Sequence, residues 1–284
     1  YVTLSSSRRD PAAMDSYLAD PVEGKLTLVA ENPGIGNIAS VSADNRRVLV
    51  DRTKSRGDND LYLVEVSSRK ETRITPHTPP ALFYGGDIAP DGETIYFTSN
   101  DGRDLGAFAR VRLGPGGKPG PIEVLAERSG AELDGYGMND QGTVAVLQWN
   151  VAGRTELELY DTRTGKRSAG PSTSSELAGG FSFSRDGNQL AFSSSGSATP
   201  SDIWVHDFRT KKTSRLTSSS HAGVDLASLV KPELVRFMAH DGIELSGWLY
   251  EPRGFKKPGP VVFSFHGGPE GQERPAFRSD YQAL

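Results

Sequence analysis

The sequence predicts an all-β propeller of four-stranded blades over residues 1–217, followed by the first strands of an α/β domain from residue 234. Two observations support this: a strand-and-turn unit that recurs about every 47 residues, and an abrupt change of pattern after Thr217. The composition agrees with it. Hydrophobic residues make up 36% of the 284 residues and charged residues 24%, which is typical of a globular protein with a buried core.

The repeating unit is recognised by a turn that contains an aspartate and precedes a short apolar strand. With Asp44, Asp91, Asp140 and Asp186 as anchors, the spacings are 47, 49 and 46 residues (91−44, 140−91 and 186−140). Each unit continues through a loop, a second strand, a turn and a last strand, as a propeller blade requires. A β-sandwich has equally short strands but no reason to repeat them at a fixed period.

A further, incomplete copy of the unit is expected at the start of the chain. Residues 15–20 align with residues 60–65 at an offset of 45, which places residues 1–4 at the second strand of a blade. The propeller is therefore expected to hold about four and a half blades and to form an incomplete ring in this chain. Because an open ring would leave bare strand edges, further blades are expected upstream of Tyr1.

Charge and cysteine content exclude several classes of function. The formal net charge is −4, so no field of one sign indicates a nucleic-acid or membrane partner. The apolar runs are far shorter than a membrane span. The absence of cysteine excludes disulfides and thiolate chemistry, but it leaves the compartment open between cytoplasmic and periplasmic or secreted. The sequence also leaves a homo-oligomer open.

The pattern changes beyond Thr217. Residues 218–233 form a serine-rich linker that runs into a short helical stretch, and Pro232 ends this stretch. Two strands, 234–239 and 243–250, are then expected around a turn at residues 240–242. After a loop, residues 260–265 are almost fully apolar, as in a strand buried on both faces of an α/β sheet.

That last predicted strand runs directly into His266-Gly267-Gly268-Pro269. A strand that ends in His-Gly-Gly resembles the oxyanion-hole loop of α/β-hydrolases, in which a backbone N–H faces the developing alkoxide. His266, Gly267 and Gly268 are therefore the candidate oxyanion loop, with the His266 ring expected to brace it. Residues 234–284 would then be the N-terminal part of an α/β-hydrolase catalytic domain.

In its order of elements the chain resembles the prolyl oligopeptidase family of serine peptidases, in the acylaminoacyl-peptidase and dipeptidyl-peptidase branch. The resemblance is diffuse over residues 1–217 and sharp over residues 238–284, where the hairpin 238–252 precedes the segment 261–269. It implies hydrolysis of short peptides by a Ser-His-Asp triad. It also implies a propeller that admits small peptides and keeps folded proteins out.

The nucleophile motif of such enzymes, Gly-x-Ser-x-Gly, does not occur in the 284 residues. In α/β-hydrolases the nucleophile precedes the acid and the histidine, so the whole triad is expected after Leu284. This chain is therefore expected to hold no catalytic residue and to be inactive alone. Two alternatives stay open: a non-catalytic TolB-like propeller that binds proteins, and an esterase of the same layout. Peptide specificity and exo- or endopeptidase mode are not specified.

Neither a cofactor nor a metal is expected. Residues 34–39 match Gly-x-Gly-x-x-Ala, but a turn follows where a dinucleotide site needs a helix. Residues 58–60 and 100–104 are rich in Asp and Asn, yet they lack the distal glutamate of a calcium loop. No two of the five histidines have metal-ligand spacing; these are His77, His206, His221, His240 and His266.

Overall fold

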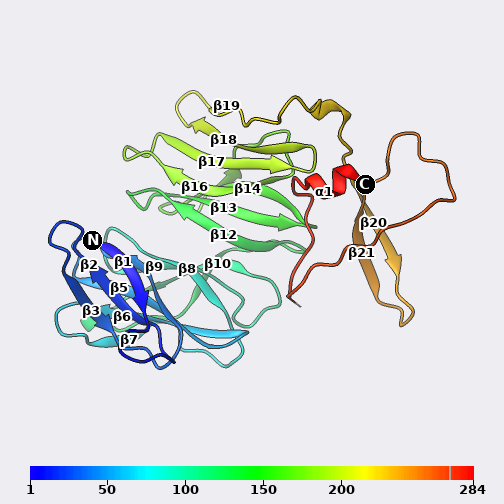
Figure 1. The fold of residues 1–284 in the computed structure, drawn as a ribbon. Coiled ribbons are helices and arrows are strands. Elements are labelled where there is room, and N and C mark those ends of the chain that lie inside the picture. Colours follow the sequence, from blue (N-terminus) through cyan, green and yellow to red (C-terminus); the bar gives the residue numbers. More distant parts are fainter. Residues whose placement is uncertain (269) are drawn as a thin grey trace. The chain divides into compact units, whose positions relative to one another are not determined.

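The computed structural model of the chain describes residues 1–268 and 270–284. Its regular structure is almost entirely β-strand (Figure 1). The chain divides into two compact units, residues 1–147 with 160–166 and residues 148–159 with 167–284. Among the described residues, no helix combines the length and the apolar character needed to cross a bilayer.

Four four-stranded sheets follow one another along the chain, and within each sheet the strands lie in chain order. Neighbouring strands run antiparallel, as in the pairs β5–β6, β9–β10 and β17–β18. This is the predicted blade pattern. The strands are β4 (Gly36–Val41), β5 (Arg47–Ser55), β6 (Asp58–Glu65) and β7 (Glu71–Arg73); β8 (Phe83–Ile88), β9 (Thr94–Ser99), β10 (Ala107–Arg112) and β11 (Glu123–Ala126); β12 (Glu132–Met138), β13 (Val144–Val151), β14 (Arg154–Asp161) and β15 (Arg167–Ala169); and β16 (Leu177–Phe183), β17 (Gln189–Gly196), β18 (Thr199–Asp207) and β19 (Lys212–Arg215).

A three-stranded sheet precedes them, formed by β1 (Val2–Ser6), β2 (Asp15–Ala19) and β3 (Leu26–Ala30). Its strands pair in the same antiparallel order as the second, third and fourth strands of the later sheets. The same order would fit the first, second and third strands, so the expected position of residues 1–4 stays a prediction. Between residues 1 and 217 the only helical turn in the described structure is η1 (Pro115–Gly117).

The third strand of two sheets begins near a buried aspartate that pairs with an arginine on the fourth strand. Asp60 on β6 lies 2.7 Å from the Arg73 guanidinium on β7. Asp202 on β18 lies 2.9 Å from that of Arg215 on β19. Both carboxylates are almost inaccessible to solvent, and a buried charge is stable only with such a partner.

The hairpin between the first two strands of each four-stranded sheet closes on one recurring turn. The fourth residue of the turn has a positive φ, which favours Gly or Asn. Its N–H donates to the carbonyl three residues earlier. The four positive-φ residues are Asn45 (+57°), Gly92 (+67°), Gly142 (+65°) and Gly187 (+70°).

This turn corrects one predicted anchor. Asp44, Asp91 and Asp186 each directly precede the positive-φ residue, but in the third sheet that position belongs to Gln141 and not to Asp140. The spacings are therefore 47, 50 and 45 (91−44, 141−91 and 186−141). The physical reason is that Asn139 caps this turn, since its Oδ1 accepts from the N–H groups of Thr143 and Val144 at 2.8 and 3.0 Å.

The hydrophobic core lies within and between the sheets. One buried cluster joins the sheet β4–β7 to the sheet β8–β11, because alternate side chains of adjacent sheets face each other. Its members are Leu49, Leu61, Leu63, Ile74, Ala81, Phe83, Ile95, Phe97, Ala109, Val111 and Leu113.

After β19 the chain forms η2 (Leu226–Ser228), the hairpin β20 (Glu233–Met238) and β21 (Glu244–Leu249), and α1 (Ser279–Ala283). The short helical stretch and the hairpin agree with the sequence prediction. The predicted strand over residues 260–265 is absent, and the side chains of Val261, Phe263 and Phe265 are 65, 75 and 86% exposed. A strand that buries both faces needs neighbouring strands and covering helices, and the described residues supply neither here.

Candidate functional site

The candidate oxyanion loop is a solvent-exposed turn. His266, Gly267 and Gly268 are all exposed, and His266 Nδ1 lies 3.1 Å from the carbonyl oxygen of Gly267. Pro269, the last residue of the predicted motif, lies outside the described residues. The expectation that the His266 ring braces the loop stays a prediction.

Glycine is required at two positions around this turn. Gly268 has a φ of +133°, a conformation that L side chains rarely adopt. A Cβ on Gly271 would lie 2.6 Å from the Gly267 carbonyl oxygen and 2.7 Å from His266 Nδ1. Sequence reasoning missed Gly271, although a third glycine so close to the motif is the signal that could have found it.

The segment before the loop is tied to the C-terminal helix. The hydroxyls of Ser264 and Tyr281 are 2.7 Å apart, and the Tyr281 hydroxyl donates to Glu273 Oε1 at 3.1 Å. Since the Tyr281 proton is directed to Glu273, Ser264 is the donor in the first bond. The Tyr250 ring packs edge-on against Tyr281, and burial raises the pKa of Tyr250 to about 12.

Side-chain amides fix the segment that follows the loop. Asn150 Nδ2 donates to Gln272 Oε1 at 2.7 Å. Gln282 Nε2 donates to the carbonyls of Ser197 and Val230 at 3.0 and 2.8 Å, and its Oε1 accepts from the Val230 N–H at 2.9 Å. The loop 266–268 is thus an exposed turn between anchored segments. It contains no Ser, Thr or Cys side chain that could act as a nucleophile.

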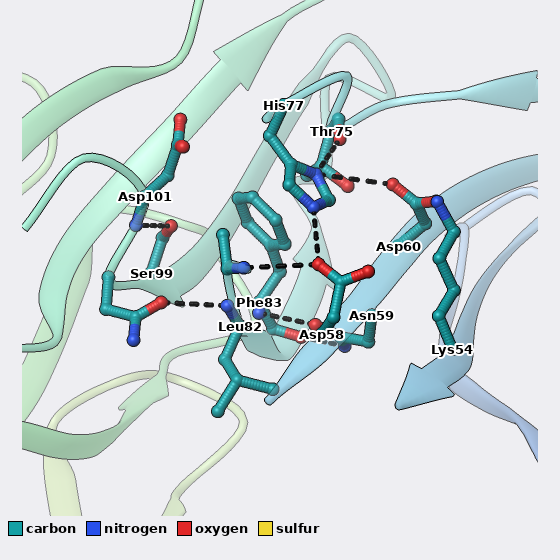
Figure 2. A network of polar contacts seen from close by, with 12 residues as sticks. Lys54, Asp58, Asn59, Asp60, Thr75, His77, Leu82, Phe83, Ser99 and Asp101 are labelled. Atoms are coloured by element: carbon teal, nitrogen blue, oxygen red, sulfur yellow. Dashed lines mark hydrogen bonds and ion pairs between the residues drawn. The ribbon is translucent and has the colours of Figure 1, made fainter. Parts of the chain in front are cut away.

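Asp58 and Asp60, two of the aspartates weighed as calcium ligands, contact basic side chains. Figure 2 shows Asp58 beside the His77 ring and Asp60 beside Lys54. Asp60 also pairs with Arg73. Within the described part of the chain, no group of three or more His, Asp or Glu residues has a geometry suited to a metal ion.

The other sequence-predicted positions serve structural roles. Residues 36–39 of the Gly-x-Gly-x-x-Ala match lie in β4 and not at a strand-to-helix turn. In the 100–104 loop, Asn100 Oδ1 accepts from the Leu82 N–H at 2.8 Å and Arg103 pairs with Glu127. His206 lies on β18 and contacts Thr213, whereas His221 and His240 lie exposed in loops.

The fold has extensive counterparts among solved structures. A prolyl endopeptidase structure superposes with a TM-score of 0.81 at 16% identity, over 99% of this chain and 43% of the other. A puromycin hydrolase in complex with PGG matches with a TM-score of 0.74 at 16% identity, over 94% of this chain and 43% of that one. Prolyl oligopeptidase B from Galerina marginata, bound to a 25mer macrocyclization substrate, matches with a TM-score of 0.70 at 15% identity, over 82% of this chain and 34% of the other.

These likenesses establish the fold of the chain. The chain spans less than half the length of each of these structures. No protein-family model matches it.

Proposed function

We propose that this chain is the propeller and the entrance to the catalytic domain of a serine peptidase that hydrolyses short peptides. The proposed divisions are the propeller at 1–217, a linker at 218–233 and the catalytic-domain portion at 234–284. The triad would lie beyond Leu284. The observation that carries the proposal is the superposition on a prolyl endopeptidase, because it covers 99% of the chain and so extends past the sheets into this last portion.

The hairpin β20–β21 supports the assignment of residues 234–284. Phe237, Leu245 and Leu249 lie on one face of the hairpin and are 52, 43 and 41% exposed. Exposed apolar faces of this kind mark surfaces that pack against further structure. A scaffold propeller has no need for such a hairpin, whereas the first strands of a catalytic domain would be covered by the rest of that domain.

The apolar segment 261–265 supports it in the same way. Phe263 and Phe265 stack on each other with ring centroids 6.3 Å apart, while both remain exposed. In the proposed enzyme this segment pairs into a parallel sheet and buries both faces. His266, Gly267 and Gly268 then follow the carboxyl end of a strand, where open α/β sheets bind their ligands.

The proposed mechanism divides the work between this chain and the triad. A serine, whose proton passes to the histidine, attacks the peptide carbonyl. The C–N bond then breaks, the histidine gives the proton to the departing amine, and water hydrolyses the acyl-enzyme. A backbone N–H of the loop 266–268 donates to the oxyanion as charge develops on it. The propeller limits access to small peptides. Structures of the same fold with bound peptide substrates support this substrate class.

A serine-directed fluorophosphonate probe tests the proposal. The chain of 284 residues should not be labelled, because it lacks the nucleophile motif, whereas the chain extended through its downstream sequence should be labelled on one serine. Labelling of the 284-residue chain itself would contradict the location of the triad. An extended chain that folds, superposes on the same structures and still resists the probe would favour the non-catalytic propeller.

An extended chain that is labelled must still be assigned to peptides or esters. We expect it to cleave the amide bonds of short peptides. We expect it to leave intact a folded protein that contains the same peptide sequences. If it hydrolyses only esters, the esterase alternative holds.

A further inference from the structure

The side chain of His77 is completely buried, and it lies in the segment that connects β7 to β8. Its ring packs against Phe83 with centroids 4.9 Å apart. Nδ1 lies 2.8 Å from the Thr75 carbonyl oxygen, and Nε2 lies 2.8 Å from Asp58 Oδ1 (Figure 2). Both ring nitrogens therefore face oxygen atoms.

These two contacts fix the number of protons in the site. A carbonyl oxygen can only accept, so Nδ1 carries a proton. Oδ1 of Asp58 already accepts from the Ala81 N–H at 3.1 Å. Without a second proton, the lone pairs of Nε2 and of the carboxylate would face each other at 2.8 Å. The contact between His77 and Asp58 is attractive only with a proton between them.

The same carboxylate holds the next sheet in place. Asp58 lies at the start of β6, and the Ala81 N–H that it accepts belongs to the segment leading into β8. Asn59 adds two bonds to Phe83, with Oδ1 accepting from its N–H at 2.7 Å and Nδ2 donating to its carbonyl at 2.6 Å. Residues 58 and 59 thus join the sheet β4–β7 to the sheet β8–β11.

Charged groups near His77 come from β5, β6 and β7. Asp58 and Asp60 lie on β6, with Asp60 Oδ1 3.5 Å from Nδ1. Arg73 on β7 lies 3.5 Å from the same nitrogen, and Lys54 on β5 pairs with Asp60. Asp51 on β5 accepts a hydrogen bond from Asn59 Nδ2. Lys54 and Arg73 both pair with Asp60, which leaves the Asp58 carboxylate as the partner of the proton on His77.

We propose that the proton shared by His77 and Asp58 is a latch on the joint between the sheets β4–β7 and β8–β11. The latch is closed while the pair holds this proton and opens when the proton is lost. A rise in pH should therefore loosen residues 81–83, whereas acidification should weaken the joint only when the Asp58 carboxylate is protonated as well. The hydrogen bond from His77 lowers the pKa of Asp58, which agrees with the ionised pair.

Nitrogen NMR of the histidine rings tests the protonation directly. At pH 7 we expect both nitrogens of His77 to show the shifts of protonated nitrogens. His206 is the internal control, because it is only half-buried and burial lowers its pKa from the usual 6.5. We therefore expect His206 to show one unprotonated nitrogen at that pH. A His77 ring with an unprotonated nitrogen at pH 7 would overturn the proposal.

Amide exchange tests the consequence for the joint. The Ala81 and Phe83 protection factors, corrected for the intrinsic pH dependence of exchange, should fall roughly tenfold or more between pH 6 and pH 9, the change expected when a hydrogen bond to a charged group is lost. In His77→Gln, which cannot titrate, they should stay at one value over this range. If the protection factors of Ala81 and Phe83 in the wild type do not change with pH, the proposal is overturned. If His77→Gln does not fold, the NMR result on the wild type tests the proposal by itself.

Discussion

The indole N–H of Trp248 donates to the main-chain carbonyl of Glu273 at 3.0 Å. Trp248 lies on β21, and Glu273 lies in the segment that follows the candidate oxyanion loop. The Arg154 guanidinium lies over the Trp248 ring, with its Cζ 5.1 Å from the ring centroid. The ring also packs against Gly153. The Trp248 side chain therefore anchors the segment around Glu273, which follows the candidate oxyanion loop, to the hairpin β20–β21.

Replacing Trp248 by Phe should loosen that segment while the ring packing is largely kept. The substitution removes one neutral hydrogen bond, whose loss costs about 0.5–1.5 kcal/mol. We expect faster amide exchange and faster proteolysis within residues 272–282. Ser246→Ala is the matched control, because Ser246 is exposed on the same strand. If both variants exchange alike, Trp248 does not hold the segment.

The recurring turn makes a second prediction, at Gly142. A Cβ there would meet Pro90 Cδ at 2.7 Å, and the φ of +65° is itself unfavourable for alanine. Gly142→Ala should therefore cost more stability than Gly102→Ala, since Gly102 has a similar φ of +69° but no atom within 4 Å of the added Cβ. The backbone term of about 1–2 kcal/mol is common to both, and the overpacking at Pro90 adds about 1–3 kcal/mol. Equal denaturation midpoints would show that Pro90 moves aside without cost.

The blade pattern was predictable from sequence because turn and strand chemistry is local. Asx residues and glycine specify the tight turn within four residues, and the apolar strand follows directly. The same local chemistry explains the error at Asp140. Asn139 can cap a turn through its own Oδ1. In the third repeat the aspartate therefore stands one position earlier in the turn than in the other three.

The sites were less predictable because they depend on contacts distant in sequence. The burial expected of residues 260–265 requires neighbours that the described residues do not supply. The role of His77 depends on Asp58, 19 residues away. Residues 58–60 were recognised as acidic, but only the fold shows that Lys54 and Arg73, which are partly exposed, lie opposite Asp60.

Acid stability should depend on the turn at Asp186. The hydrogen bond from the Ser184 hydroxyl, together with two bonds from Asn188, lowers the pKa of Asp186 to about 2. A depressed folded pKa contributes stability that is present above the unfolded value of 3.8 and is lost as the pH falls towards 2. The stability difference between the wild type and Asp186→Asn should therefore shrink between pH 4 and pH 2.

Urea denaturation at a series of pH values measures this difference. Asp104→Asn, at an exposed aspartate in the loop between β9 and β10, controls for the change in net charge. A difference between wild type and Asp186→Asn that stays constant from pH 5 to pH 2.5 would show that the carboxylate contributes nothing to the turn.

The proposed oxyanion loop calls for three variants in the enzyme extended through its downstream sequence. Gly268→Pro removes the backbone N–H. Gly268→Ala keeps the N–H but strains the φ of +133°. Gly57→Ala is the control, because Gly57 lies outside the loop and a Cβ there would meet no atom within 4 Å. Each variant must first show the melting temperature of the wild type, since a folding defect would mimic a loss of catalysis.

The kcat of well-folded Gly268→Pro on a short peptide tests the central claim most directly. Losing one oxyanion donor costs roughly 2.7–4 kcal/mol of transition-state stabilisation, or about 10²–10³ in kcat. We expect kcat to carry most of this loss and KM little of it, because the bond strengthens only in the transition state. Gly57→Ala should stay near the wild-type kcat. A near-normal kcat for Gly268→Pro would contradict the assignment of residues 266–268 as the oxyanion loop.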